Sequence, residues 1–307
     1  MNKKAQVEVS FNWIFVLIAG FAIMMFFIML INNRTESSQE DLAKTITERM
    51  SNIFESIQSN PNTAQLHQRA NYELEFSCRE GVHEFRQIRS SSSQYLENSI
   101  VFTPRIIGNS QLATLTLREN LPFLTTSTLL LTDTNTHYVF NSALTSYHNW
   151  LPSIFSKSIG GYSDAEIAAR DHRKVVYVTT PTDSSTSTQN IDVIKINTSN
   201  GQIIFDDGNS LNFFSQEMAL GAIITGEYEL ANCNFQKINQ SFERMKFVLS
   251  ERKDNISDKL SANCQSLYNN TNIDLDFNLD LPTFRTKSIE LDQRNRELER
   301  LGCPTIY

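Results

Sequence analysis

One uninterrupted apolar run near the N-terminus restricts what this chain can fold into more than any other feature. Residues Phe11–Ile31 read FNWIFVLIAGFAIMMFFIMLI and carry no charge. A helix over this run rises about 31 Å, which matches a hydrocarbon layer of ~30 Å. Helices of this length in globular proteins are rarely apolar on every face. We therefore predict a transmembrane helix over residues 11–31, with the lipid bilayer as its partner.

The charges on either side of the run predict its orientation. Lys3 and Lys4 precede it, whereas acidic residues outnumber basic ones just after it. Because basic residues are retained on the cytoplasmic side, we expect residues 1–10 in the cytoplasm and the bulk of the chain outside it. The run is too long for a cleaved signal peptide, and no small-x-small site follows it. The predicted location is the cell membrane, crossed once.

The first residues resemble the short basic leader of archaeal type IV pilin-like (class III) proteins. Lys3-Lys4-Ala5-Gln6 precedes the apolar run as the leader does in that family, which implies processing between Ala5 and Gln6. The sequence departs from the family at the fifth residue after the cut, where Ser10 replaces the usual Glu and the acidic residue is Glu8 instead. The resemblance implies export, and it implies assembly more weakly.

Residues 32–60 have the pattern of a helical stalk. Apolar side chains recur there at spacings of three and four, which is typical of one helix face: Leu42, Ile46, Met50, Ile53 and Ile57. Fewer than three heptads are present, so packing on the chain's own domain is favoured over pairing with a second copy. Asn60-Pro61-Asn62 is expected to end the helix.

The middle of the chain predicts a mixed sheet. Apolar and polar residues alternate in Asn71–Cys78, which predicts a half-exposed strand. A helix-like stretch, Ser142–Phe155, lies between the strand-like segments His137–Phe140 and Lys174–Thr179 and fits a βαβ unit. Asn200-Gly201 predicts a hairpin turn. The fold class is α/β, with α+β as the alternative.

The C-terminal part is expected to be mostly helical. Residues 232–267 have apolar side chains at helical spacing, as one helix or as two with a break near Asp254-Asn255. Asn272–Leu281 alternates like a strand, and Ser288–Leu301 predicts a helix capped by Ser288. The predicted organisation is therefore a leader (1–10), a transmembrane helix (11–31), a stalk (32–60), an α/β domain (70–225) and a helix-rich region (226–307).

Four stretches together resemble an uncharacterised family of archaeal single-pass membrane proteins. They are FNWIFVLIAG in the apolar run, LPFLTTSTLLLTD (Leu121–Asp133), the segment Gly226–Met245 and the terminal LGCPTIY (Leu301–Tyr307). The resemblance spans nearly the whole chain. It implies placement in a membrane but no activity.

The four cysteines, Cys78, Cys233, Cys264 and Cys303, are too far apart for a C-x-x-C metal or redox motif. An even number outside the cytoplasm permits two disulfides. Buried free thiols are the alternative, and the sequence does not choose among the three possible pairings. We predict no metal site and no cofactor.

No other motif indicates catalysis or nucleic-acid binding. The net charge is −7 without a basic cluster, which argues against a nucleic-acid partner. The five histidines are scattered, and Walker, G-x-G-x-x-G and G-x-S-x-G motifs are absent. One acidic series has the spacing of a calcium loop but lacks the Gly and Glu that an EF-hand requires: Asp274, Asp276, Asn278 and Asp280.

Three functions are compatible with these observations. The first is a non-enzymatic protein of the cell envelope that assembles with envelope partners or further copies through the anchor and stalk. The second is a receptor-like ligand-binding domain, which predicts a cleft at the carboxyl ends of the parallel strands. The third is a hydrolase, which would require His137, His148 or His172 to meet carboxylates in a pocket.

Overall fold

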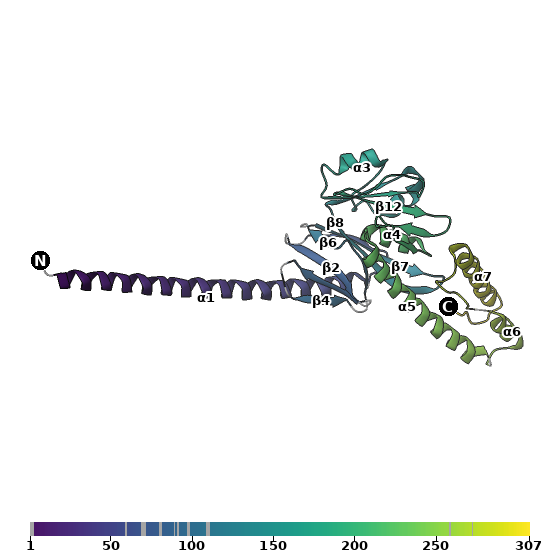
Figure 1. The fold of residues 1–307 in the computed structure, drawn as a ribbon. Coiled ribbons are helices and arrows are strands. Elements are labelled where there is room, and N and C mark those ends of the chain that lie inside the picture. Colours follow the sequence, from purple (N-terminus) through teal and green to yellow (C-terminus); the bar gives the residue numbers. More distant parts are fainter. Residues whose placement is uncertain are drawn as a thin grey trace.

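A single long helix projects from three sheets and several shorter helices (Figure 1). The computed structural model describes residues 3–58, 60–68, 72–79, 82–88, 90, 92–96, 99–108, 111–257, 259–271 and 273–307. Within the long helix, side chains are described for residues 16–30 and 40–57. The helices are α1 (Lys3–Gln58), η1 (Ser142–Leu144), α2 (Thr145–Trp150), α3 (Tyr162–Ala168), α4 (Gln216–Thr225), α5 (Tyr228–Ser257), α6 (Ala262–Asn270) and α7 (Leu281–Arg300).

The strands form three sheets. The first has the order β4-β3-β2-β6, the second β1-β7-β8-β5 and the third β10-β9-β11-β12-β13-β14. Their bounds are β1 (Ala64–Gln68), β2 (Glu73–Arg79), β3 (Val82–Gln87), β4 (Ser93–Leu96), β5 (Ile100–Phe102), β6 (Ile106–Gly108), β7 (Gln111–Asn120), β8 (Leu124–Asp133), β9 (Thr136–Phe140), β10 (Lys157–Ile159), β11 (Lys174–Thr179), β12 (Ile191–Asn197), β13 (Gln202–Ile204) and β14 (Ser210–Asn212).

The prediction of a transmembrane helix is wrong for the part of the chain that the structure describes. Among those residues, no helix combines the length and the apolar character needed to cross a membrane. The apolar side chains described in this region run from Val16 to Leu30.

The C-terminal part of α1 packs on its own body, as the stalk analysis favoured. Met50, Phe54 and Ile57 are buried against the first two sheets, and the Phe54 ring centroid lies 5.4 Å from that of Phe85. The predicted stripe was wrong in two places, because Leu42 and Ile53 are 60% and 38% exposed. The buried face is rotated by one residue and includes Ala43, Thr47 and Phe54. As predicted, α1 ends just before Asn60-Pro61-Asn62.

The third sheet contains the predicted βαβ unit. Strands β9 and β11 are parallel neighbours, and the chain between them also forms β10, which is parallel to the other edge of β9. The helix predicted over Ser142–Phe155 is shorter, because α2 ends at Trp150, just before Leu151-Pro152. The hairpin at Asn200-Gly201 is confirmed by the antiparallel pairing of β12 with β13. Gly201 has a positive φ of 72° there.

The C-terminal part is helical, with two corrections. Asn272–Leu281 is not a strand where it is described, although Ile273 and Leu275 are buried as alternation suggested. The final helix begins earlier than predicted, because Asp280 rather than Ser288 is its N-cap and accepts a hydrogen bond from the Thr283 backbone N–H at 2.7 Å. Asp280 followed by Leu281-Pro282 is a stronger start signal than Ser288, because proline suits the first turn of a helix.

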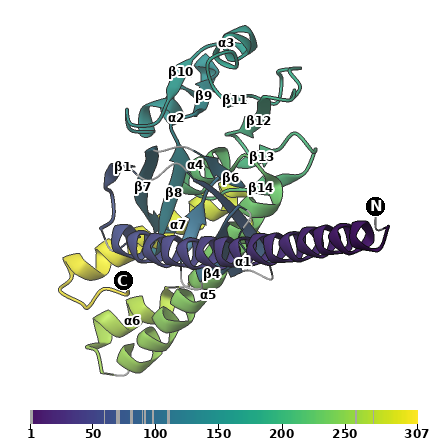
Figure 2. The ribbon, with the colours of Figure 1, turned by 90° about the vertical axis from the view of Figure 1, so that its left-hand side faces the viewer.

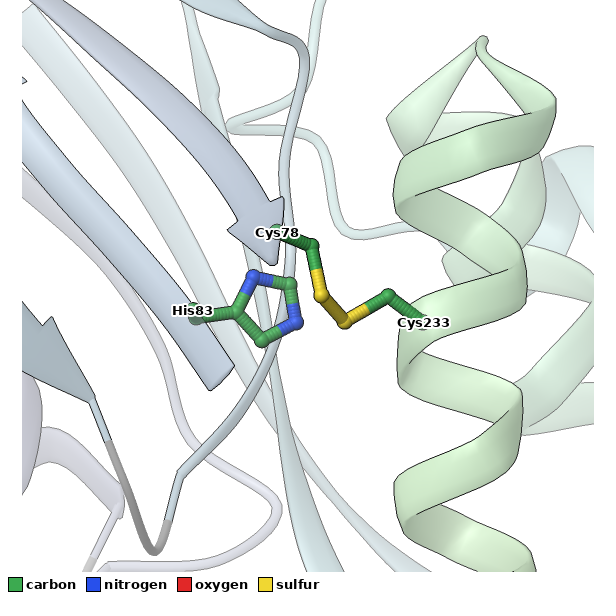
Figure 3. Close-up of side chains that lie close together, drawn as sticks. All are labelled: Cys78, His83 and Cys233. Carbon is green, nitrogen blue, oxygen red and sulfur yellow. A yellow bond between two sulfur atoms is a disulfide. The ribbon is translucent and has the colours of Figure 1, made fainter. Parts of the chain in front are cut away.

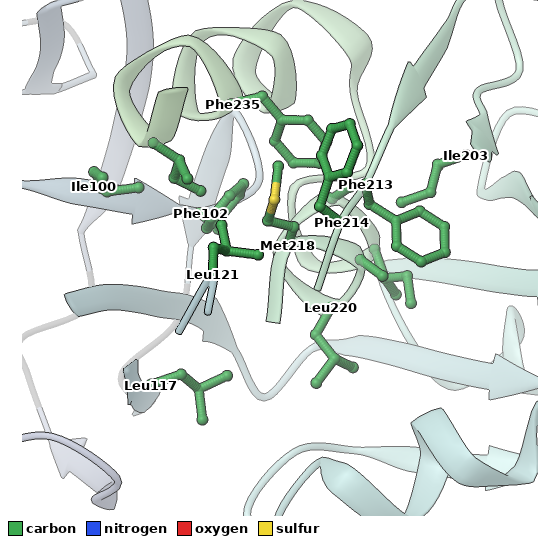
Figure 4. Packing of buried hydrophobic residues seen from close by; sticks show 14 of the residues in the cluster. Ile100, Phe102, Leu117, Leu121, Ile203, Phe213, Phe214, Met218, Leu220 and Phe235 are labelled. Carbon is green, nitrogen blue, oxygen red and sulfur yellow. The ribbon is translucent and has the colours of Figure 1, made fainter. Parts of the chain in front are cut away.

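The largest core lies around α4 (Figure 4). This helix is buried along almost its whole length and packs between the second and third sheets, while α5 covers the same side of the second sheet. Gly221 of α4 faces the Phe102 ring so closely that an added Cβ would lie 2.5 Å from a ring carbon. Only glycine permits that approach. The two views in Figures 1 and 2 show α1 leaving the body on the side of the first sheet.

Candidate functional site

The four cysteines form two disulfides. Cys78 of β2 is bonded to Cys233 of α5, and Cys264 of α6 is bonded to Cys303 after α7. The first bond links segments 155 residues apart, whereas the second closes a loop with a sequence separation of 39. The first disulfide therefore ties the N-terminal sheet to the helical half of the chain, and the second fixes the C-terminus beside α6.

A buried histidine lies beside the first disulfide (Figure 3). His83 of β3 is directly opposite Cys78 in the antiparallel β2–β3 ladder, so their side chains emerge on the same face of the sheet. His83 is completely buried. One ligand atom from each of Cys78, His83 and Cys233 can be chosen so that all three lie within 4.8 Å of one another. We call these three residues the Cys-His cluster.

The hydrogen bonds around His83 determine which ring nitrogen carries the proton. The Asn234 amide nitrogen donates to the Val101 carbonyl at 2.9 Å and to the Leu230 carbonyl at 3.2 Å, so its oxygen faces the imidazole. That oxygen lies 2.7 Å from His83 Nε2, which must therefore be the donor. Nδ1 is left with a lone pair and has no hydrogen-bond partner among the described residues.

Burial, together with a nearby positive charge, keeps this histidine neutral. Burial, with the nearby Lys237 ammonium, lowers the pKa of His83 to about 4, although the Asn234 hydrogen bond opposes the shift. Lys237 follows Cys233 by one turn of α5 and is itself buried, and it donates to the Leu96 carbonyl at 3.0 Å and to the Ser99 carbonyl at 3.2 Å. A positive charge close to a cysteine stabilises its thiolate form.

The projecting part of α1 is the second notable feature. From Val16 to Leu30 its large apolar side chains are 39–69% exposed. They face every side of the helix rather than one stripe, because the run contains no polar residue. Ala5 and Gln6, the predicted processing site, lie near the start of α1, where the side chains are outside the described residues.

The histidines considered for hydrolysis do not form a triad. His137 and His172 stack with ring centroids 4.7 Å apart, and the His137 nitrogens lie 2.7 Å from Ser156 Oγ and 2.9 Å from Ser158 Oγ. His148 is elsewhere and contacts the side-chain oxygen of Asn149. None of the described contacts of His137 is with a carboxylate. They therefore include no acidic group that would orient the imidazole as a general base.

A receptor-like cleft was expected at the carboxyl ends of the parallel strands. Two grooves of the structure lie elsewhere. A cleft of about 260 Å³ lies at the amino ends of β9, β11 and β12, and its Lys174 and Asp192 form an ion pair at 2.7 Å. A larger groove of about 540 Å³ lies between the α6–α7 connection and α7. At the carboxyl ends, Asp183 instead accepts hydrogen bonds from the Tyr177 and Thr179 hydroxyls.

The acidic series near residue 276 is a turn that leads into a helix. The Asp276 carboxylate accepts hydrogen bonds from the backbone and side chain of Asn278, and Asp280 caps α7. Asp274 pairs with Lys287 at 3.3 Å. Each of these three carboxylates thus has its own local partner.

Comparison with known protein families, curated proteins and solved structures found no match. The resemblances to pilin-like leaders and to an archaeal membrane family therefore stay predictions.

Sequence reasoning missed the Cys-His cluster because its members come from three segments. A signal was present in hindsight, since Cys78 and His83 flank a short connection between two alternating segments. Cys233 carries no local signal for the cluster, because only the packing of α5 against β2 brings it there.

Proposed function

We propose that this chain is a non-enzymatic assembly protein of an oxidising, extracytoplasmic compartment, in which the projecting part of α1 bundles with the same helix of other copies. The observation that carries the proposal is the continuous exposure of apolar side chains from Val16 to Leu30. A helix that is apolar on all sides is stable only when it is surrounded. Patches of this kind on a protein surface mark interaction sites.

The free energy gained by burying these apolar side chains favours association. Each large apolar side chain that moves from water into a packed interior contributes roughly 1.5–3 kcal/mol, and twelve such residues lie in this segment at 39–69% exposure. Their burial would contribute on the order of 10 kcal/mol per copy, which exceeds the lower estimates for the entropy lost on association.

Several copies fit this helix better than one partner. A single neighbour covers only one face, so an all-round apolar helix needs contacts in several directions. A head-to-tail contact repeated between copies supplies them, and it extends into a filament when the rotation does not close. The resemblance of the first residues to a pilin-like leader supports an assembly role more weakly than this exposed segment does.

The cysteines support the proposed compartment. All four are paired in disulfides, which persist in oxidising surroundings and are rare in the cytoplasm. The packing of Met50, Phe54 and Ile57 fixes the base of α1 to the body. In an assembly, each body would be displayed at a defined angle to the bundle.

A pair of matched variants tests the proposal. Phe26 in the projecting segment and Phe247 on α5 are 62% and 65% exposed, and both lie on helices. We expect the full-length protein to sediment as large assemblies without detergent. Phe26→Glu should shift it to monomers or small oligomers, whereas Phe247→Glu should leave the assemblies intact. A wild-type protein that is monomeric in buffer, or equal effects of both substitutions, would contradict the proposal.

A further inference from the structure

We infer that Asn197, at the turn between β12 and β13, is the acceptor for an N-linked oligosaccharide on the folded chain. The inference rests on the extracytoplasmic compartment proposed above, because Asn-x-Ser/Thr sites receive glycans on exported proteins. The sequence contains five such sites, at Asn33, Asn197, Asn239, Asn255 and Asn269. Two groups of a site must be accessible: the asparagine amide nitrogen that is modified and the hydroxyl two residues later that completes the site.

The side chain of Asn197 is held by its oxygen and leaves its nitrogen available. Asn197 ends β12, and its backbone carbonyl accepts a hydrogen bond from the Gly201 N–H at 3.0 Å. Its side-chain oxygen accepts hydrogen bonds from the backbone N–H groups of Ser199 at 3.1 Å and Asn200 at 3.4 Å. This is an Asx turn. The amide nitrogen of Asn197 donates to no group within the described structure.

The other residues of this site are also accessible. Thr198, Ser199 and Asn200 are all exposed at the tip of the hairpin. Gly201 has a positive φ of 72° and returns the chain into β13. The Ser199 hydroxyl, which completes the site, has no hydrogen-bond partner in the part of the chain that the structure describes. A transferase can therefore reach both groups without opening the hairpin.

The geometry of a helix disfavours Asn239. This residue lies in the middle of α5, and its side-chain oxygen is buried without a hydrogen-bond partner among the described residues. Side chains two residues apart on a helix do not face each other. The Ser241 hydroxyl is therefore not presented beside the Asn239 amide. The side chain of Asn33 lies outside the described residues.

Asn255 and Asn269 are exposed, but the hydroxyls that complete their sites are engaged. Ser257 is buried and donates a hydrogen bond to the Asn269 side-chain oxygen at 3.0 Å. Thr271 is also buried and donates to the Leu267 carbonyl at 2.8 Å. A transferase that needs these hydroxyls would have to break hydrogen bonds that hold α5 and α6 together.

The transfer is balanced without an oxidant or a reductant. The donor is a sugar chain whose anomeric carbon is bonded to a polyprenyl phosphate or diphosphate, and a membrane glycosyltransferase of the cell catalyses the step. Asn197 Nδ2 attacks the anomeric carbon and forms a C–N bond, while the bond from that carbon to the phosphate oxygen breaks. The lipid phosphate leaves with the electron pair of the broken bond, and Nδ2 releases one proton.

The first test uses the full-length protein isolated from the cells that naturally produce it. Glycopeptides are mapped by mass spectrometry, and free thiols are counted by alkylation of the same sample. We expect a glycan at Asn197, none at Asn239 and no free thiol. An unmodified Asn197 in a chain with both disulfides formed would overturn the inference and leave the proposed compartment intact. Four free thiols would refute the compartment, and the inference with it.

A matched pair of substitutions at the exposed tip tests the assignment to this site. Ser199→Ala, made in the native host, should lose the glycan completely, so that the mass falls to that of the unmodified chain. Thr198→Ala changes the neighbouring exposed residue but keeps the site, and it should retain the glycan. Circular dichroism checks that both variants fold. Loss of the glycan in both variants, or in neither, would overturn the assignment.

Asn197→Gln distinguishes attachment to nitrogen from attachment to a nearby hydroxyl. The variant should lose the glycan, and a sugar that remains would be linked through a hydroxyl and would refute the inference. The hairpin belongs to the third sheet, whereas α1 packs on the first two. Asn197→Gln should therefore sediment as the wild-type protein does, which separates this result from the test of assembly through α1.

Discussion

Glu119 gives the structure a built-in sensitivity to alkaline pH. It lies near the end of β7, is completely buried, and neither carboxylate oxygen has a hydrogen-bond partner among the described residues. Burial, with the negative charge of Glu217 added to it, raises the pKa of Glu119 from 4.5 to about 8, and the nearby Ser215 hydroxyl offsets part of this shift. The folded protein therefore holds a proton on Glu119 at neutral pH.

The sign of the effect on stability follows from proton binding. Between pH 4.5 and pH 8 the folded state binds the Glu119 proton and the unfolded state does not. The contribution of Glu119 to the free energy of unfolding therefore falls by about 1.4 kcal/mol for each pH unit across this window and is constant outside it. Over the whole window the loss is about 5 kcal/mol, a large share of the ~5–15 kcal/mol that stabilises a typical domain.

Glu119→Gln tests this reasoning, because glutamine keeps the shape and removes the titration. Urea midpoints of the wild type and the variant are measured at pH 5, 6, 7 and 8 with the disulfides intact. We expect the variant to gain stability relative to the wild type at each step up in pH, since the difference cancels the titration of all other groups. A wild-type-minus-variant difference that stays constant from pH 5 to pH 8 would refute a buried neutral carboxyl.

Two further predictions concern the packing of α1 and the C-terminal disulfide. Phe54→Ala should destabilise the protein by about 3–5 kcal/mol in urea unfolding, because the ring is fully buried against Phe76 and Phe85. The neighbouring Ile53→Ala, at a site that is 38% exposed, should cost far less, and equal losses would contradict the observed face of α1. Cys264→Ser/Cys303→Ser opens a loop with a sequence separation of 39, which should cost about 4 kcal/mol and make the C-terminus sensitive to proteolysis. An unchanged midpoint and cleavage pattern would contradict a stabilising bond.

Strands and turns with strong local patterns were predictable from the sequence. The alternation predicted a strand over Asn71–Cys78, of which Glu73–Cys78 belongs to β2 and Asn71 lies outside the described residues. The pair Asn200-Gly201 predicted a hairpin, and the hairpin is present. The stalk was recognisable as a helix because its apolar residues recur at spacings of three and four. The buried face of this helix was not predictable. Thr47 and Phe54 are buried and Leu42 is exposed, and this choice depends on where distant strands lie.

The candidate site and the transmembrane prediction show what local patterns do not contain. Asn272–Leu281 alternates like a strand but has no neighbouring strand to pair with in the described structure. Where it is described, it forms an irregular connection and a turn, from which Ile273 and Leu275 reach the core. The pairing of Cys78 with Cys233 spans 155 residues and depends on the docking of α5. An apolar run indicates that a helix needs an apolar environment. The sequence does not specify whether lipid or protein provides that environment.

The β2–β3 ladder connects the base of α1 to the first disulfide. Phe76 is opposite Phe85, and Cys78 is opposite His83, one rung further along the same face. The first rung packs on Phe54 of α1, and the second is bonded to α5. The attachment of the projecting helix and the Cys-His cluster therefore lie on the same face of one small sheet, two residues apart along β2. The Cys78–Cys233 disulfide therefore gives covalent support directly beside the base of α1.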